Sequence, residues 1–142
     1  MKIRTMILPL VSVAALSAAY ADNGGRPLST LLTGATEVPG PGDTDGQGSA
    51  EIRINPGQGQ LCYTLKVSGI DTATAAHVHE AVAGKAGPVV VGLTAPVAGN
   101  VKDCVTITRE LAKEIIRTPS DYYVNVHNAA FPRGAVRGQL GK

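Results

Sequence analysis

Hydrophobic and polar residues alternate along much of the chain with a period of two. In Ser49–Asn55 the alanine and both isoleucines share one face, and in Gln60–Ser68 the apolar side chains again occupy every second position. Successive side chains of a strand point to opposite faces, so this pattern predicts strands with one buried face. The expected strands are residues 28–34, 49–55, 60–68, 74–79, 88–93, 103–107, 121–127 and 134–140. About eight short strands separated by Gly- and Pro-rich turns predict an all-β fold, an antiparallel sandwich or Greek-key barrel.

One segment has a helical pattern instead. In Thr108–Arg117 the apolar residues Leu111 and Ile115 are spaced four apart, Thr108 is a suitable N-cap, and Pro119 ends the segment. We expect a short helix that packs on the core and has no part in the chemistry.

The N-terminus has the features of a secretory signal. Lys2 and Arg4 precede an apolar run, Ile7–Ala19, which ends in a small-x-small cleavage site. We therefore expect export to the periplasm or the exterior. The expected divisions are a signal peptide at 1–21, a flexible leader at 22–27 and one domain at 28–142.

Cleavage changes the charge of the chain. It removes Lys2 and Arg4, which leaves 11 basic residues against the 11 acidic ones. A net charge of zero favours neither nucleic acid nor an anionic membrane surface as a partner. No second apolar run is long enough to span a bilayer, so we expect no stable membrane insertion after cleavage. The chain also lacks the Gly-rich motifs of nucleotide-binding proteins, and no nucleotide cofactor is expected.

The two cysteines, Cys62 and Cys104, are expected to form a disulfide. Export to an oxidising compartment makes a bridge the default. Each cysteine also lies opposite the apolar face of its own strand, so the two occupy matching faces. The alternative is a pair of thiolate metal ligands, which export disfavours.

The three histidines of the chain lie in two similar patterns. His77 and His79 flank a valine, and His127 follows Asn125 and two alternating valines. If the valines face the core, all three imidazoles project from the outer face of the same sheet. Three convergent imidazoles suit a transition metal. Copper is favoured where metals compete, and zinc suits the same ligands. The alternative is that these are unrelated histidines making ordinary hydrogen bonds.

Several stretches of the sequence also match the motifs of a known family. They are Leu32–Pro39, Leu61–Tyr63, Ala75–Glu80 with Gly84 and Gly87-Pro88, Tyr122–His127, and Gly134–Leu140. Together they resemble the CHRD domain, a module named from its repeats in chordin and also found in exported bacterial proteins. The resemblance covers nearly all of the chain after the signal. It implies an immunoglobulin-like β-barrel and little about activity.

A second resemblance concerns mechanism. Val67–Ile70 leading into Ala76–Glu80 is similar to a stretch of the copper–zinc superoxide dismutases, where the same His-Val-His-Glu supplies two copper ligands. The resemblance implies that His77, His79 and His127 bind copper. It also makes Arg137, or equally Arg133, a weak candidate for an arginine that attracts the anionic substrate.

Two further residues are candidates for supporting these ligands. Glu80 and Asn125 lie next to them in sequence and could hydrogen-bond a histidine from behind, although Glu80 could equally be a solvated surface residue. The chain departs from the dismutase pattern because Glu80–Gly99 contains no histidine, so the metal-bridging ligand is absent. The zinc-binding loop is absent too. The resemblance therefore implies a single, open metal site with weak turnover at most.

Two functions remain open from the sequence. The first is an exported protein that binds one copper ion, for sequestration or for weak redox chemistry such as superoxide dismutation. The second is a metal-free, non-enzymatic module that binds an unknown protein partner outside the cytoplasm, as the chordin context suggests.

Overall fold

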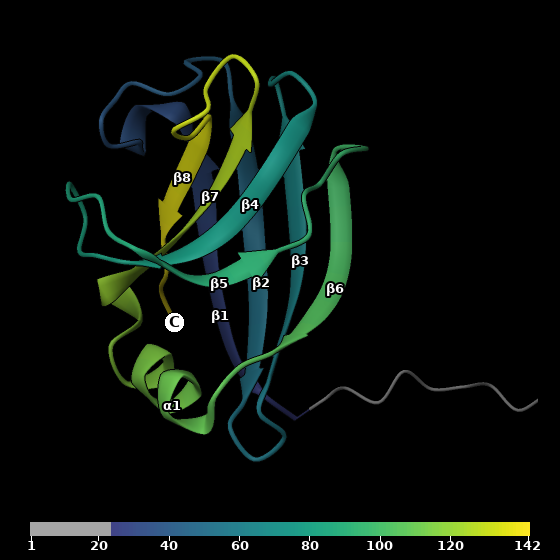
Figure 1. Cartoon of the computed structure of the whole chain (residues 1–142), viewed down its shortest axis with the longest axis vertical. Helices are drawn as coiled ribbons and strands as arrows, with labels where there is room; N and C mark the ends of the chain where they lie inside the picture. The colour runs from purple at the N-terminus through teal and green to yellow at the C-terminus, as the bar shows by residue number, and fades with distance from the viewer. Residues whose placement is uncertain (1–23) are drawn as a thin grey trace, which may run out of the picture.

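The computed structural model describes residues 24–142 as an eight-stranded antiparallel sheet with one α-helix (Figure 1). The all-β fold expected from the alternation is confirmed. The elements are β1 (Arg26–Thr33), the 3-10 turn η1 (Gly34–Thr36), β2 (Gln47–Asn55), β3 (Gln60–Ser68), β4 (Ala73–Glu80), β5 (Val89–Leu93), β6 (Asn100–Thr106), α1 (Arg109–Arg117), the 3-10 turn η2 (Pro119–Asp121), β7 (Tyr122–Asn128) and β8 (Val136–Gln139). The expected signal peptide lies outside the described residues. Within residues 24–142, no helix has the length and apolar character needed to cross a bilayer.

The strands pair in the order β5-β4-β7-β8-β1-β2-β3-β6. Figure 1 shows β5, β4, β7 and β8 as one layer and β1, β2, β3 and β6 as the layer behind it. β8 joins the two layers, since Arg137 pairs with Thr33 of β1. At the other side, the backbone N–H of Thr94, just after β5, donates to the Tyr63 hydroxyl of β3 at 2.7 Å. The sheet is therefore nearly closed into a barrel.

The core follows the predicted alternation. Val78 of β4 and Val124 and Val126 of β7 are 0% exposed and face the back layer's isoleucines and leucines. Burial of one such side chain stabilises the fold by about 2 kcal/mol. Because these three valines point inward, the residues between them must point outward.

Two strands have ends that differ from those expected from the sequence. β1 begins at Arg26, ahead of the expected start at Leu28, because Arg26 and Pro27 pair with β2. β8 is shorter than the expected strand 134–140. Its first expected residue, Gly134, has a φ of 139° and belongs to the turn after β7.

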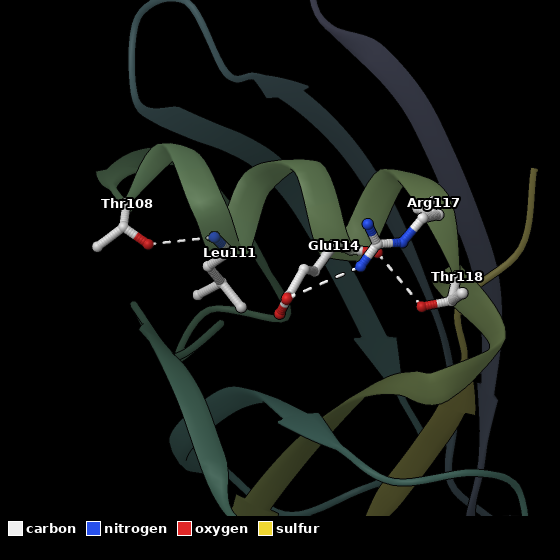
Figure 2. A network of polar contacts seen from close by, with 5 residues as sticks. All are labelled: Thr108, Leu111, Glu114, Arg117 and Thr118. Atoms are coloured by element: carbon white, nitrogen blue, oxygen red, sulfur yellow. Dashed lines mark hydrogen bonds and ion pairs between the residues drawn. The ribbon is translucent and has the colours of Figure 1, made fainter.

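The helix α1 closes one end of the barrel, as Figure 1 shows. The Thr108 Oγ1 accepts a hydrogen bond from the Leu111 backbone N–H at 3.1 Å, which confirms the expected N-cap (Figure 2). Ala112 and Ile115 are buried in the core. The exposed ion pair between Glu114 and Arg117, at 3.8 Å, adds little stability.

The predicted disulfide is confirmed. Cys62 of β3 and Cys104 of β6 are directly opposite in the register, and their sulfurs are bonded. The bridge lies on the outer side of the β3–β6 pair, and β6 is an edge strand of the sheet.

Loss of this bridge should reduce the stability of the whole domain. The bridge closes a loop with a sequence separation of 42 residues. Chain-entropy arithmetic for a loop of this size gives about 4 kcal/mol, as an upper value. The double change Cys62→Ala with Cys104→Ala should lower the free energy of unfolding in urea by up to this amount, and reduction of the wild type should have the same effect. Equal stabilities of the oxidised and reduced proteins would contradict this expectation.

Candidate metal centre

The three histidines lie together on the outer face of β4 and β7. His77 and His79 alternate with the inward Val78, and His127 follows the inward Val126. In the register His77 is opposite Asn125, which places His127 one diagonal step away on the same face. The sequence prediction that these imidazoles share a face agrees with the structure.

The ligand atoms of the three rings converge. One nitrogen from each histidine lies within 4.8 Å of the other two. His77 Nδ1 is 3.0 Å from His127 Nε2. Two nitrogens bound side by side to one metal at about 2.0–2.1 Å would themselves be about 3 Å apart. The geometry of this pair therefore fits shared coordination.

Two backbone carbonyls fix the orientation of two of the rings. His79 Nδ1–H donates to the Gly87 carbonyl at 2.9 Å, and His127 Nδ1–H donates to the Pro132 carbonyl at 3.1 Å. In a neutral imidazole, a proton on Nδ1 leaves a lone pair on Nε2. Both Nε2 atoms can therefore act as ligands, and a carbonyl behind each ring is the usual support for a metal-binding histidine.

The loop between β4 and β5 is held over the outer face by polar side chains beneath it. Gly87 approaches so closely that a Cβ there would clash with the Glu80 carbonyl oxygen, so only glycine fits. Its N–H donates to the Tyr123 hydroxyl at 3.3 Å, and the Tyr123 ring stacks on His79 with centroids 4.6 Å apart. His79 is consequently only 8% exposed.

Burial and mutual repulsion favour the neutral forms of His77 and His127. Burial lowers the pKa of His77 below its usual value, and the neighbouring His127 and His79 lower it further. Burial also lowers the pKa of His127, although its bond to the Pro132 carbonyl works in the opposite direction. Neutral imidazole is the form that binds a metal, so at neutral pH the site is ready for one.

The two arginine candidates occupy very different places. Arg137 is 1% exposed, and its guanidinium lies 3.4 Å from the Tyr123 ring centre. It donates to the carbonyls of Lys85 and Val82 at 2.7 and 3.3 Å, which holds the β4–β5 loop in place. It is therefore not exposed to attract an anion. Arg133 is exposed, in the loop whose Pro132 carbonyl supports His127.

Glu80 and Asn125, the two residues expected to support the ligands, also lie in different surroundings. Glu80 is exposed, as in the alternative of a solvated surface residue, and the Nδ1–H of His79 donates to the Gly87 carbonyl. Asn125 is 2% exposed, and its Oδ1 lies 2.9 Å from His79 Nε2 and 3.0 Å from His127 Nε2. Asn125 is therefore in contact with two of the three rings, and Glu80 is on the surface.

Sequence analysis missed Glu37, which lies just after η1 and is 5% exposed. Burial raises the pKa of its carboxyl group from 4.5 to about 7, although the charge of Arg137 and a hydrogen bond from Asn125 lower it in part. Its Oε1 has no hydrogen-bond partner among the described residues. A Cβ on Gly134 would clash with that oxygen, so this glycine makes room for the carboxylate. An acidic residue next to a Gly- and Pro-rich loop gives little sign of this in the sequence.

The comparisons with known proteins identify the family and nothing finer. The CHRD domain family matches residues 28–140, almost all of the described chain. No curated protein and no solved structure matches. The resemblance to the copper strands of the superoxide dismutases therefore has no support from these comparisons.

Glu37 should make the stability of the metal-free protein depend on pH. With its pKa raised from 4.5 to about 7, the folded state holds this proton more tightly than the unfolded state does. The resulting stabilisation is complete below pH 4.5 and is lost as the pH rises through 7. At about 1.36 kcal/mol per pH unit, Glu37→Gln should gain about 3 kcal/mol relative to wild type between about pH 4.5 and 8. The measurement is urea unfolding of both proteins across this range. A difference that does not change with pH would mean that Glu37 stays ionised.

Proposed function

The chain belongs to the CHRD domain family, and we propose that it binds a single copper ion through His77, His79 and His127. The observation behind this proposal is the convergence of three imidazoles, two of them with their Nδ1–H groups already taken by backbone carbonyls. Family membership and the disulfide are both consistent with an exported protein. We further propose the periplasm or the exterior as its location, after removal of residues 1–21.

The donor set favours copper over the alternatives. Three imidazoles with no thiolate and no carboxylate among them suit Cu(II) and Zn(II), and do not suit Mg²⁺ or Ca²⁺, which take oxygen ligands. Copper forms the more stable complexes of the two where both are available. Bound copper would supply one-electron redox chemistry. The chain's own residues hold the rings in place, and burial favours the neutral forms of His77 and His127.

The site is open on the side of β5. Gly92 is the partner of His77 in the β4–β5 register, and a Cβ built on it meets nothing within 4 Å. His77 is accordingly only half-buried, unlike His79. An ion or a small molecule could reach the ligand atoms from this side.

Removal of one ligand should abolish tight copper binding without unfolding the protein. Partners behind a ligand are typically worth roughly 10- to 100-fold in metal affinity, so losing a ligand itself in His127→Ala should cost about 100-fold or more. The matched control is Glu80→Gln. Glu80 adjoins a ligand in sequence but is exposed, so this change should leave the affinity unaltered. The measurement is Cu(II) titration in a competing chelator, together with thermal melting of the metal-free proteins.

Two results would contradict the proposal. One is a large loss of metal-free stability in His127→Ala, which would make the histidine structural. The other is wild-type protein, purified from the periplasm, that contains no metal and takes up none. The metal-free interaction module would then be the better account.

We also propose that any superoxide dismutation is slow. Arg137 is buried under the β4–β5 loop, so of the two arginine candidates only Arg133 is exposed to a substrate. Without a strong cationic field, the rate constant should lie roughly 100-fold or more below the diffusional ceiling of about 10⁹ M⁻¹s⁻¹. The measurement is superoxide decay with copper-loaded protein under a chelator that removes free copper. A rate near the ceiling that is abolished by His77→Ala would reverse this ranking and make the protein a dismutase.

A further inference from the structure

A fourth polar atom lies among the three histidine nitrogens. Asn125 Oδ1 is 2.9 Å from His79 Nε2 and 3.0 Å from His127 Nε2, and His127 Nε2 is in turn 3.0 Å from His77 Nδ1. These three separations are nearly equal. Each matches the spacing of about 3 Å expected between neighbouring ligands of one metal.

When Asn125 Oδ1 faces the rings, its contacts with His79 and His127 lack the protons that ordinary hydrogen bonds need. The Nδ1–H groups of His79 and His127 donate to backbone carbonyls, and in the neutral tautomer that carries this proton each ring presents a lone pair at Nε2. Asn125 Oδ1 also presents lone pairs. Three acceptors thus face one another, inside a site where Asn125 is 2% exposed, and the nearest proton available to them is one on His77 Nδ1, 3.0 Å from His127 Nε2. A cation at their common centre satisfies all three.

Glu37 selects the orientation of the Asn125 amide. In its ionised form the Glu37 carboxyl group can only accept, so its hydrogen bond with Asn125 uses the Nδ2 end of the amide as donor. With Nδ2 turned toward Glu37, Oδ1 must face the histidines. Gly42 and Gly134 enclose the carboxylate closely, because a Cβ on either would clash with a Glu37 side-chain atom. The Glu37 side chain therefore has little room to move away from the Asn125 amide.

We propose that Asn125 Oδ1 is the fourth protein ligand of the metal, and that Glu37 is the residue that positions it. This inference rests on the proposed metal site. It changes the donor set from three nitrogens to three nitrogens and one oxygen. Carboxamide oxygen is a known weak ligand of copper. The Glu37 carboxylate behind it also places a negative charge near the cation.

The competing arrangement is a reversed amide. In that arrangement Nδ2 would donate its two protons to the Nε2 atoms of His79 and His127, and Asn125 would orient the rings without touching the metal. Whether Asn125 is a ligand or a positioning residue therefore depends on which end of its amide, Oδ1 or Nδ2, faces the metal. A measurement of Cu(II) affinity alone does not separate the two roles, because loss of a ligand and loss of a positioning residue both weaken metal binding.

The direct experiment is a crystal structure of the wild-type protein loaded with Cu(II), with EPR of the same sample. We expect copper on all three histidines and Asn125 Oδ1 within about 2.0–2.5 Å of it. An Asn125 side chain more than about 3 Å from copper would overturn the inference while leaving the three-histidine site intact. Protein that takes up no copper would instead refute the proposed function.

Variants give an independent reading in solution. Asn125→Asp keeps the shape of the side chain but replaces a neutral oxygen donor by an anionic one. We expect a lower g∥ and a d–d band at higher energy, because the carboxylate is the stronger donor. The matched control is Asn100→Asp, the same change at an exposed position that starts β6, which should leave both signals unchanged. Identical spectra for Asn125→Asp and wild type would overturn the inference.

Glu37→Gln tests the positioning role. The carboxamide that this change introduces can satisfy either end of the Asn125 amide, so it no longer selects the orientation. The Cu(II) affinity should fall about 10- to 100-fold, as is usual for a partner behind a ligand, and the EPR signal should change with it. A drop in affinity with an unchanged EPR signal would mean that Glu37 acts only on stability, and would remove it from the site.

Discussion

The pairing of β4 with β7, with its valines inward, is the constraint on which the rest of the site depends. Val78 opposite Val124 is a fully buried pair at the centre of the front layer. A shift of this register by one residue would expose the valines and bury the histidines, which is unfavourable on both counts. Hydrophobic burial in the core therefore fixes the positions of the imidazoles on the outside, although no histidine contributes to that core.

Polar and aromatic contacts hold the side chains on the outer face of these strands. Arg137 lies over Tyr123, which stacks on His79, and both the arginine and the tyrosine also bond to the β4–β5 loop. The loop in turn supplies the Gly87 carbonyl that orients His79. A charged group buried this deeply would be very unfavourable without partners, and here carbonyls and an aromatic face provide them. The arginine thus acts on the histidines through the loop.

Alternation in the sequence was enough to predict the fold class, the disulfide and the shared face of the three histidines, because each depends on which way a strand side chain points. The same reasoning failed for residues whose roles depend on loops. Glu37 reaches Asn125 only because the segment after η1 folds back beneath the β7–β8 turn. Arg137 was one of two weak candidates for an arginine that attracts substrate, but a loop covers it. Loop paths depend on tertiary contacts that no local pattern encodes.

The fold and the site use separate sets of residues on opposite faces of the same strands. Changes at His77 or His127 should therefore alter chemistry with little effect on the core, since both are half-buried and neither belongs to the hydrophobic cluster. Glu37 is different. Its burial is unfavourable for the charged form, and one of its oxygens lacks a partner among the described residues. A buried carboxylate that destabilises the metal-free fold at neutral pH is readily understood if its charge becomes favourable when a cation is bound nearby. The loss of stability caused by burying Glu37 is thus linked, through Asn125, to the proposed binding of a metal by the three histidines.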